Sequence, residues 1–339
     1  KTVTYCVMDE GGRILERGKM GWEVSEWQGA LDRYGRENVE VAFETGSDGY
    51  RAKGMLEGLG IEMYPFHAAN FRAIWCSRKK TDRIDAERIC RALKGGGLPE
   101  RVKLAGKEEE RLRNLVVEWE LRLKSIQMQL NRVRGLARCR GVELPSWTRK
   151  KAGEWWEEVI RLFEKADQSS VKRSYRTALS ELQGLEELDT ELEEQIGKAG
   201  HTERVGWLRS VPGIGEVTSR AVVAYAGDGK RFRSGKKFAA YVGLTPTVDQ
   251  TGVQAVRIGH ISRQGPASLR RLFIQAAQAA TRTKSFSRTR WNKWFYRLQA
   301  RRGRKIAIVA LAKKLSEVCY AILRDGKEWS EERLWPMAP

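Results

Sequence analysis

Two long stretches in the middle of the chain carry apolar side chains at helical spacing. The first set recurs at steps of three and four residues and consists of Leu112, Leu115, Trp119, Leu123, Ile126, Leu130 and Val133. The second set follows mostly the same steps and consists of Tyr175, Leu179, Leu182, Leu185, Leu188, Leu192 and Ile196. Such spacing places apolar side chains along one face of an α-helix. It predicts two long amphipathic helices, which either pair as an antiparallel coiled coil, serving as an arm or dimerisation element, or are simple bundle helices.

The first hundred residues show a different pattern, in which short apolar runs alternate with turn residues. The expected strands are 2–8, 14–18, 39–43 and 61–66, and the expected helices are 24–34, 50–59 and 81–93. The turn sequence DEGGR between the first two strands predicts a β-hairpin. A strand, a helix and a strand at the spacing of residues 39–66 are typical of a parallel βαβ unit. This part of the chain is therefore predicted to be an α/β domain.

A proline-glycine turn marks the start of the C-terminal part. The segment WLRSVPGIGEVTSRAVVAYAG (207–227) places Gly213 and Gly215 between two apolar helical stretches. This pattern matches a helix-hairpin-helix, in which glycines let backbone N–H groups at a helix N-terminus approach a phosphate. A tight turn between two helices, with no ligand, is the alternative.

Charge is distributed very unevenly along the chain. The net charge is +20, and residues 230–305 hold nineteen lysines and arginines but one acidic residue, Asp249, so that this segment alone carries +18. We call residues 230–305 the basic tract. So strong a local charge indicates a polyanionic partner, held through phosphate contacts and counterion release. An anionic membrane is disfavoured because no basic amphipathic anchor stands out.

Aromatic residues are interleaved with the cations of the basic tract. They are Phe286, Trp291, Trp294, Phe295 and Tyr296, within the segment SFSRTRWNKWFYRLQARRGRK. Aromatic faces can stack on splayed nucleobases. The alternative, which we favour, is that the aromatic rings pack a helix against the core while the cations face outward.

Composition excludes several classes of protein. The chain has 339 residues with 41% hydrophobic and 31% charged side chains, which is typical of a soluble globular protein of about two domains. It shows neither an apolar run long enough to span a membrane nor a signal peptide. The five cysteines are widely spaced and the three histidines are scattered, which is typical of reduced thiols in a cytoplasm and argues against zinc.

Three carboxylates form a candidate metal site. Asp82 and Asp85 lie three residues apart, so they project from one face of the expected helix, while Glu44 follows a predicted strand. Such oxygen ligands suit Mg²⁺ and phosphodiester chemistry. The structural alternative is that Thr81 or Asp82 caps the helix, with Asp85 completing a variant capping box. On local sequence alone the capping interpretation is the stronger one.

Six segments together resemble one known family. They are VAFETGSDGY, SRKKTDRIDAERIC, VPGIGEVTSRAVVAYAG, FAAYVGLTP, RIGHISRQGPASLRRLF and LQARRGRKIAIVALAKKLSEVCYAIL. In this order they resemble the DEDD transposases of bacterial insertion sequences, the family numbered one-hundred-ten, which is related to the Piv DNA invertases. The resemblance extends over nearly the whole chain.

The resemblance implies a fold and an activity. The fold would be α/β plus all-α: a RuvC-like, RNase H-type domain over residues 1–105, a coiled-coil arm over 106–200, and a helical transposase domain with a helix-hairpin-helix over 201–339. The activity would be DNA recombination guided by a structured bridge RNA that pairs with donor and target DNA. Catalysis would use Glu44, Asp82 and Asp85 as Mg²⁺ ligands, together with a serine that attacks DNA to form a covalent intermediate.

The sequence departs from the family pattern at two places. The first Asp of the family precedes the strand TVTYCVM, so we expect about ten further residues upstream that end in that Asp. The family's nucleophilic serine corresponds to Thr251 in GLTPTVDQTGVQ. A threonine hydroxyl can act as a nucleophile, but its methyl group crowds in-line attack. The chain therefore uses Thr251, or is impaired, or uses Ser262 instead, in that order of preference.

The remaining expectations concern partners. The residues expected to hold DNA or guide RNA are Lys79, Lys80, Gly213, Gly215, Arg257, Arg263, Arg270, Arg271, Arg301, Arg302, Arg304 and Lys305. Two half-sites on separate domains suggest a homodimer or homotetramer, with a cytoplasmic location in a bacterium and no membrane partner. The alternatives are a RuvC-like nuclease that forms no covalent intermediate and a domesticated, non-catalytic nucleic-acid-binding protein.

Overall fold

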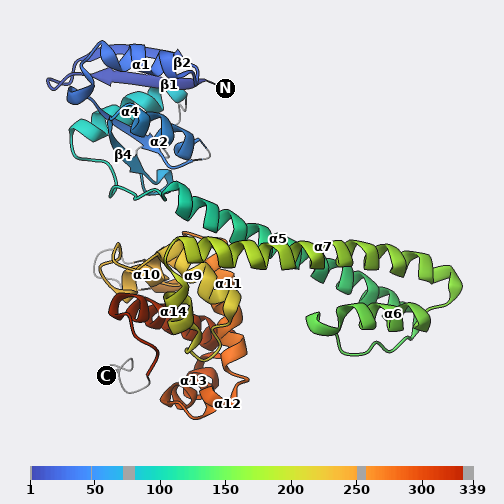
Figure 1. The fold of residues 1–339 in the computed structure, drawn as a ribbon. Helices are drawn as coiled ribbons and strands as arrows, with labels where there is room; N and C mark the ends of the chain where they lie inside the picture. The colour runs from blue at the N-terminus through green and yellow to red at the C-terminus, as the bar shows by residue number, and fades with distance from the viewer. Residues whose placement is uncertain (1, 47, 72–80, 250–256, 331–339) are drawn as a thin grey trace. The chain divides into compact units, whose positions relative to one another are not determined.

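The chain forms two compact units, residues 1–106 and 107–339 (Figure 1). The computed structural model describes residues 2–46, 48–71, 81–249 and 257–330. The first unit combines short strands with helices, whereas the second is almost entirely helical. This confirms the predicted combination of a mixed α/β part and a helical part.

A β-hairpin opens the N-terminal unit. Strand β1 (Val3–Met8) pairs antiparallel with β2 (Ile14–Met20), as predicted. The turn closes because the Arg13 backbone N–H donates to Oδ1 of Asp9 at 2.8 Å, and Gly12 takes φ +88°. Glycine adopts a positive φ without steric cost, which explains Gly12 in the turn.

The predicted parallel βαβ unit follows the hairpin. Strand β3 (Glu40–Glu44) pairs in parallel with β4 (Glu62–Phe66), and α2 (Gly49–Gly58) connects them. In the described residues this pair does not hydrogen-bond to the hairpin. Among the described residues, the other helical elements of the unit are α1 (Val24–Asp32), the 3₁₀ turns η1 (Arg36–Asn38) and η2 (Ala68–Asn70), and α4 (Asp82–Lys94).

The N-terminal unit buries its apolar residues in two small clusters. One is built around Trp27, Leu56 and Ile61, and the other around Phe66 and Phe71. Helix α4 packs against β1 and β3, and its Ile89 and Ala92 contact the second cluster. This packing positions the helix that carries Asp82 and Asp85.

Two antiparallel helices of 34 residues each open the second unit (Figure 1). They are α5 (Lys107–Arg140) and α7 (Lys165–Lys198), and they pack side by side along their lengths. At 1.5 Å per residue each is about 50 Å long. The predicted long amphipathic helices are confirmed; whether they supercoil as a coiled coil stays a prediction.

One detail of the predicted apolar face of α7 was wrong. In its first half the buried seam runs through Val171, Ser174 and Ala178, so Leu179 is 37% exposed. Tyr175 lies one position off the seam and packs against Trp156 with ring centroids 5.7 Å apart. That contact arises because the segment between α5 and α7 folds back on α7. This segment forms η3 (Arg149–Lys151) and α6 (Ala152–Leu162).

The remaining elements extend the core of the helical pair. They are α8 (Thr202–Arg209), α9 (Glu216–Ala226), α10 (Gly235–Val242), β5 (Pro246–Asp249), β6 (Arg257–Ile261), α11 (Ala267–Ala280), α12 (Lys284–Ser287), α13 (Arg290–Arg302) and α14 (Arg304–Asp325). Helix α9 packs on α5, and α14 packs on α10, α11 and α13. One continuous hydrophobic cluster therefore runs from Leu112 to Leu323.

Candidate functional site

The first turn of α4 carries the two candidate aspartates. Thr81 is the N-cap, since its backbone is extended and its Oγ1 accepts from the Ile84 N–H at 3.3 Å. Asp82 and Asp85 occupy the first turn, where negative charge favours the helix dipole. The prediction that Thr81 or Asp82 caps this helix is confirmed for Thr81, so the Asp82 carboxylate is not needed as the cap.

Asp85 is the more enclosed of the two aspartates. Its side chain is 14% exposed and lies 3.6 Å from Nη1 of Arg88, whereas Asp82 is exposed. Within the described residues, the buried Oδ1 of Asp85 accepts no hydrogen bond. A buried carboxylate oxygen without a hydrogen bond is costly. This Oδ1 is the atom that pairs with Nη1 of Arg88, so a metal ion bound here would compete with that cation.

Glu44 is the last residue of β3, the strand against which α4 packs. Its backbone stands in register with Phe66 of β4, and its side chain is half-buried. The fold thus places the strand that ends in Glu44 beside the helix that begins with both aspartates. Among the described residues, however, no three His, Cys, Asp or Glu side chains are close enough together to hold a metal ion.

Polar contacts tie α4 to the hairpin. Arg17 of β2 forms an ion pair with Glu87 of α4, and Arg91 pairs with the same carboxylate at 2.9 Å. Hydrogen bonds from Arg91 and Arg17 lower the pKa of Glu87. Cys90 of α4 lies near Cys6 of β1, and burial raises the pKa of Cys90 to about 11. These contacts hold α4 against the hairpin and do not involve Asp82 or Asp85.

The proline-glycine turn joins α8 to α9. Gly213 has φ +88°, and a Cβ there would lie 2.4 Å from the carbonyl oxygen of Ala276 in α11. This glycine is therefore required for packing as well as for its dihedral angle. A Cβ on Gly215, the N-cap of α9, would meet nothing within 4 Å. Of the two glycines, Gly215 is the one at which the backbone is open to a ligand; the phosphate role of both stays a prediction.

The β5–β6 hairpin leads into a tightly packed turn. Strands β5 and β6 pair antiparallel, and Thr251 lies outside the described residues. Directly after β6, Arg263 adopts φ 55°, which is rare for a residue other than glycine. The turn packs so closely on α10 that a Cβ on Gly265 would lie 1.9 Å from the Tyr241 carbonyl oxygen.

Ser262 stands at the start of this turn. Its backbone N–H donates to the Thr245 carbonyl at 2.8 Å. In the described part of the chain its Oγ is buried and has no hydrogen-bond partner. The Oγ is therefore not exposed in this conformation, and the choice between Thr251 and Ser262 as the nucleophile stays a prediction.

Three arginines gather near the same turn. Burial lowers the pKa of Arg270, and the neighbouring charges of Arg263 and Arg271 lower it further. Arg270 donates to the Val242 carbonyl at 3.2 Å, while Arg271 pairs with Glu120 of α5 at 2.6 Å. Like charges held this close favour binding of an anion such as phosphate. The fold therefore brings together three of the cations predicted to bind nucleic acid.

In the rest of the basic tract, aromatic side chains are mostly buried and the cationic side chains are exposed. Phe286, Trp291 and Phe295 are at most 3% exposed, and Tyr296 is 47% exposed. The favoured alternative, aromatic packing with outward cations, is confirmed for these three rings. The exposed cations of α13 and α14 include Arg301, Arg302, Arg304 and Lys305, which flank Gly303. Lys79, Lys80 and the side chain of Arg257 lie outside the described residues.

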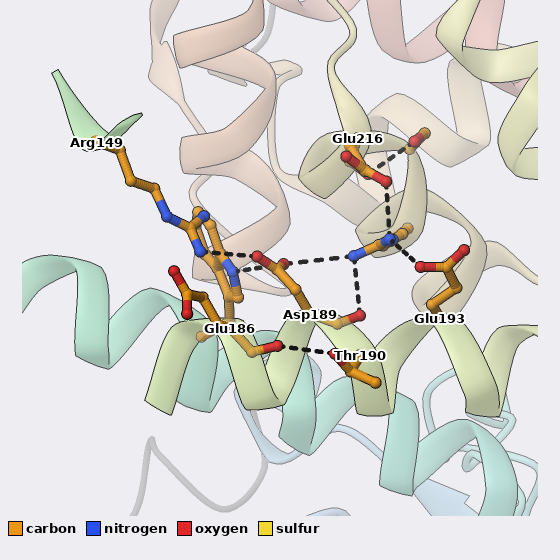
Figure 2. Close-up of polar contacts among 9 residues, drawn as sticks. Arg149, Glu186, Asp189, Thr190, Glu193 and Glu216 are labelled. Carbon is orange, nitrogen blue, oxygen red and sulfur yellow. Dashed lines mark hydrogen bonds and ion pairs between the residues drawn. The ribbon is translucent and has the colours of Figure 1, made fainter. Parts of the chain in front are cut away.

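A buried polar network locks α9 to the helical pair, and the sequence analysis did not anticipate it. Arg220 is 5% exposed and pairs with Asp189 at 3.4 Å, Glu193 at 3.4 Å and Glu216 at 2.8 Å. The Asp189 carboxylate also accepts from Trp119 Nε1 at 3.0 Å and from Arg149 at 2.9 Å (Figure 2). Within the sequence, only the four-residue spacing of Glu216 and Arg220 hints at any of these pairs.

Within the described ranges, no helix combines the length and the apolar character that crossing a bilayer requires.

Comparison with known proteins gives a consistent result. Residues 206–292 match the family described as "Transposase IS116/IS110/IS902 family". A Pseudomonas aeruginosa protein described as "Probable family 20 transposase" is 31% identical over 245 residues, covering 72% of each chain. The transposase for insertion sequence element IS1111A of Coxiella burnetii is 28% identical over 250 residues, 72% of this chain and 66% of that one. The pilin gene-inverting protein of Moraxella lacunata is 29% identical over 130 residues, 38% of this chain and 39% of that one.

Proposed function

Because the chain belongs to the IS116/IS110/IS902 transposase family, we propose that it cuts and rejoins DNA strands with the α4 carboxylates and a hydroxyl nucleophile. The observation that carries this proposal is the first turn of α4. Thr81 caps the helix, so Asp82 and Asp85 are left on one turn beside the strand that ends in Glu44.

The N-terminal unit is proposed to have an RNase H-like, RuvC-like fold. The antiparallel β1–β2 hairpin and the parallel β3–α2–β4 unit support this proposal. We likewise propose that α8 and α9 form a helix-hairpin-helix whose open position is Gly215.

The carboxylates suit Mg²⁺ as the ion of this site. Mg²⁺ prefers oxygen ligands, and the buried Oδ1 of Asp85 has no hydrogen bond within the described residues. Glu44, Asp82 and Asp85 would hold the ion after drawing closer together than they lie in the described residues of this structure. When bound, it would orient the scissile phosphate and stabilise the charge that develops on it.

The hydroxyl of Thr251 is proposed as the nucleophile. Its oxygen attacks the phosphorus and loses its proton, while the leaving deoxyribose oxygen takes up a proton. One phosphodiester bond is exchanged for a threonyl phosphodiester, so the bond energy is kept for rejoining. Ser262, whose Oγ is buried in this conformation, is the second candidate.

The basic tract would hold the nucleic acids. Exposed cations at the junction of α13 and α14, together with Arg263, Arg270 and Arg271, offer phosphate contacts. We propose DNA and a structured guide RNA as the ligands, and a homodimer or homotetramer as the active assembly.

The metal site is tested by the Asp85→Asn variant in a strand-exchange assay with the full-length protein and its bound RNA. Asparagine keeps the shape but loses the charge, so exchange should fall by at least about a hundredfold. Glu87→Gln is the matched control, because it removes a carboxylate from the same helix that is already paired with Arg17 and Arg91. Equal activity of the two variants would contradict the metal role.

The nucleophile is tested by trapping protein on nicked DNA. A covalent adduct should form with the parent protein and with Ser262→Ala but not with Thr251→Ala. An adduct that persists in Thr251→Ala and disappears in Ser262→Ala would assign the reaction to Ser262. Strand cutting without any adduct would favour a RuvC-like nuclease, and Mg²⁺-independent binding without cutting would favour a non-catalytic binding protein.

The guide RNA is tested separately. RNA that co-purifies with the protein is sequenced, and strand exchange is measured before and after ribonuclease treatment. Loss of exchange, restored by adding back the RNA, is the expected result. Full exchange by RNA-free protein would exclude RNA guidance.

A further inference from the structure

The helical pair has two halves of opposite charge. The proximal half comprises residues 107–123 of α5 and 181–198 of α7, and it carries five Lys or Arg against twelve Asp or Glu. The distal half comprises residues 124–140 and 165–180, and it carries nine Lys or Arg against one acidic residue, Asp167. The insert between the helices, residues 141–164, is nearly balanced, with four basic and five acidic residues. The distal half is therefore strongly basic although it lies outside the basic tract.

The acidic residues of the proximal half are mostly used inside the protein. Asp189 and Glu193 bind Arg220, while Glu120 binds Arg271. The other proximal acids with an ion pair are Glu109, Glu118, Glu181, Glu191 and Glu194. Intramolecular ion pairs therefore account for most of the acidic residues of the proximal half.

Intramolecular ion pairs do not account for most of the cations of the distal half. Arg140 pairs with Asp167 at 2.6 Å, and the others with no ion pair in the described part of the chain include Lys124, Arg138, Lys165, Lys172, Arg173 and Arg176. All six of these are exposed. Charges of one sign, gathered and left without counter-charges, weaken the fold slightly through repulsion. The unpaired cations of the distal half therefore indicate that this surface binds an anion from outside the protein.

The cations of α7 share one side of that helix. Lys165, Lys172 and Arg176 are separated by seven and four residues, and Arg173 is three residues from Arg176, so they project on the side away from the buried seam of Val171, Ser174 and Ala178. Arg132 of α5 donates to Ser170 of α7 at 3.4 Å, so the basic part of α5 lies against the same part of α7.

We propose that the distal half of the helical pair is a second DNA-binding surface, which holds the phosphate backbone of a duplex. The inference rests on the proposed function, since DNA is the substrate of a transposase. The basic part of α5 is about 24 Å long, enough to follow roughly seven base-pair steps. A second copy of this chain is the rival occupant, but eight of the twelve proximal acids that it would offer already have an ion pair within the protein.

The surface is tested by the variant K172Q/R173Q/R176Q of the full-length protein. Binding of a mixed-sequence DNA duplex is followed by fluorescence anisotropy over a range of salt concentrations. Losing three phosphate contacts should reduce the slope of log affinity against log salt by about 2 to 3 and weaken binding about tenfold at low salt. Glutamine is a good helix former, so the arm should stay folded, which a thermal melt checks.

The matched control is K107Q/R111Q/K198Q, which removes the same charge from the exposed proximal half of the same helices. Its slope should stay within about 1 of the parent. Equal effects of the two triple variants would overturn the proposal. A third variant, R301Q/R302Q/R304Q, reports on the basic tract. If the parent protein bound no DNA, the proposed function itself would be wrong. If the parent bound DNA and the distal variant bound it with the same affinity and salt dependence, only the proposal for the distal half would be wrong.

The remaining arms of the test exclude other occupants. If the distal variant bound an RNA duplex more weakly than the parent but bound DNA equally well, the assignment to DNA would be overturned. Light scattering reports the oligomeric state, and a smaller assembly in the distal variant would mark the surface as a subunit contact instead.

Cys139 supplies a direct probe of contact, because it is exposed at the distal end of α5. A DNA-cleaving reagent attached to this thiol should cut bound duplex in the parent protein. The cuts should disappear in Cys139→Ser and weaken in the distal triple variant. Cutting that is equally strong in the distal variant would contradict the proposal.

Discussion

The two units of the molecule hold their elements in different ways. The N-terminal unit has two small apolar clusters and relies on polar ties, such as the hydrogen bonds from Tyr5 and Tyr34 to Glu16. The C-terminal unit has one continuous core, crossed by the buried Arg220 network. The difference matches the chemistry proposed for each.

Carboxylates and nucleic-acid-binding cations make different demands on a fold. The N-terminal turn of a helix favours carboxylates through its dipole, as in the first turn of α4. Cations that hold a long polyanion must instead keep their spacing over tens of ångströms. Long helices packed on a large core provide that spacing.

The largest expected effect comes from breaking the polar network of the C-terminal unit. Arg220→Ala removes a buried guanidinium and its bonds to Asp189 and Glu216, whose side chains are 29% and 52% exposed, so the free energy of unfolding of this unit should fall by about 2 kcal/mol. Denaturant unfolding measures it. Arg161→Ala is the control, because its side chain is 80% exposed and its ion pair with Glu157 spans 4.0 Å. A loss in Arg220→Ala no greater than in this control would show that the network adds nothing to the core.

A smaller effect is expected from the cap of α4 in the N-terminal unit. Thr81→Ala removes the acceptor for the Ile84 N–H and should lower the free energy of unfolding of this unit by about 1 kcal/mol. Thr81→Ser keeps the hydroxyl and should restore it. If serine behaved like alanine, the lost methyl group rather than the cap would be responsible. A shift in the unfolding of the C-terminal unit would contradict the separateness of the two units.

The smallest change leaves stability untouched and measures water exclusion between α4 and β1. Because burial raises the pKa of Cys90 to about 11, its thiol stays protonated at neutral pH, and alkylation should accelerate about tenfold per pH unit from 8 to 10. Peptide mass mapping follows each cysteine separately. The exposed Cys139 should react first at pH 8. Equal rates for the two thiols at that pH would mean that the α4–β1 contact is open to water.

The sequence could predict what depends on local pattern. Alternation and turn residues located the hairpin and the βαβ unit, and helical periodicity located α5 and α7. The aspartates at the start of α4, the cap and the basic tract were readable for the same reason, since each is set by neighbours within a few residues. Leu179 marks the limit of this reasoning, because two adjacent apolar faces were available and packing chose between them.

Only the tertiary structure decided how distant segments share charge. The ion pairs of Arg220 with Asp189 and of Arg271 with Glu120 join residues 31 and 151 positions apart. The same contacts determine which charges of the helical pair are already neutralised and which are left for a partner. By itself the sequence determined where the helices lie and how many charges they carry. The fold determined which charges remain available, because pairing depends on distances in space that sequence spacing does not encode.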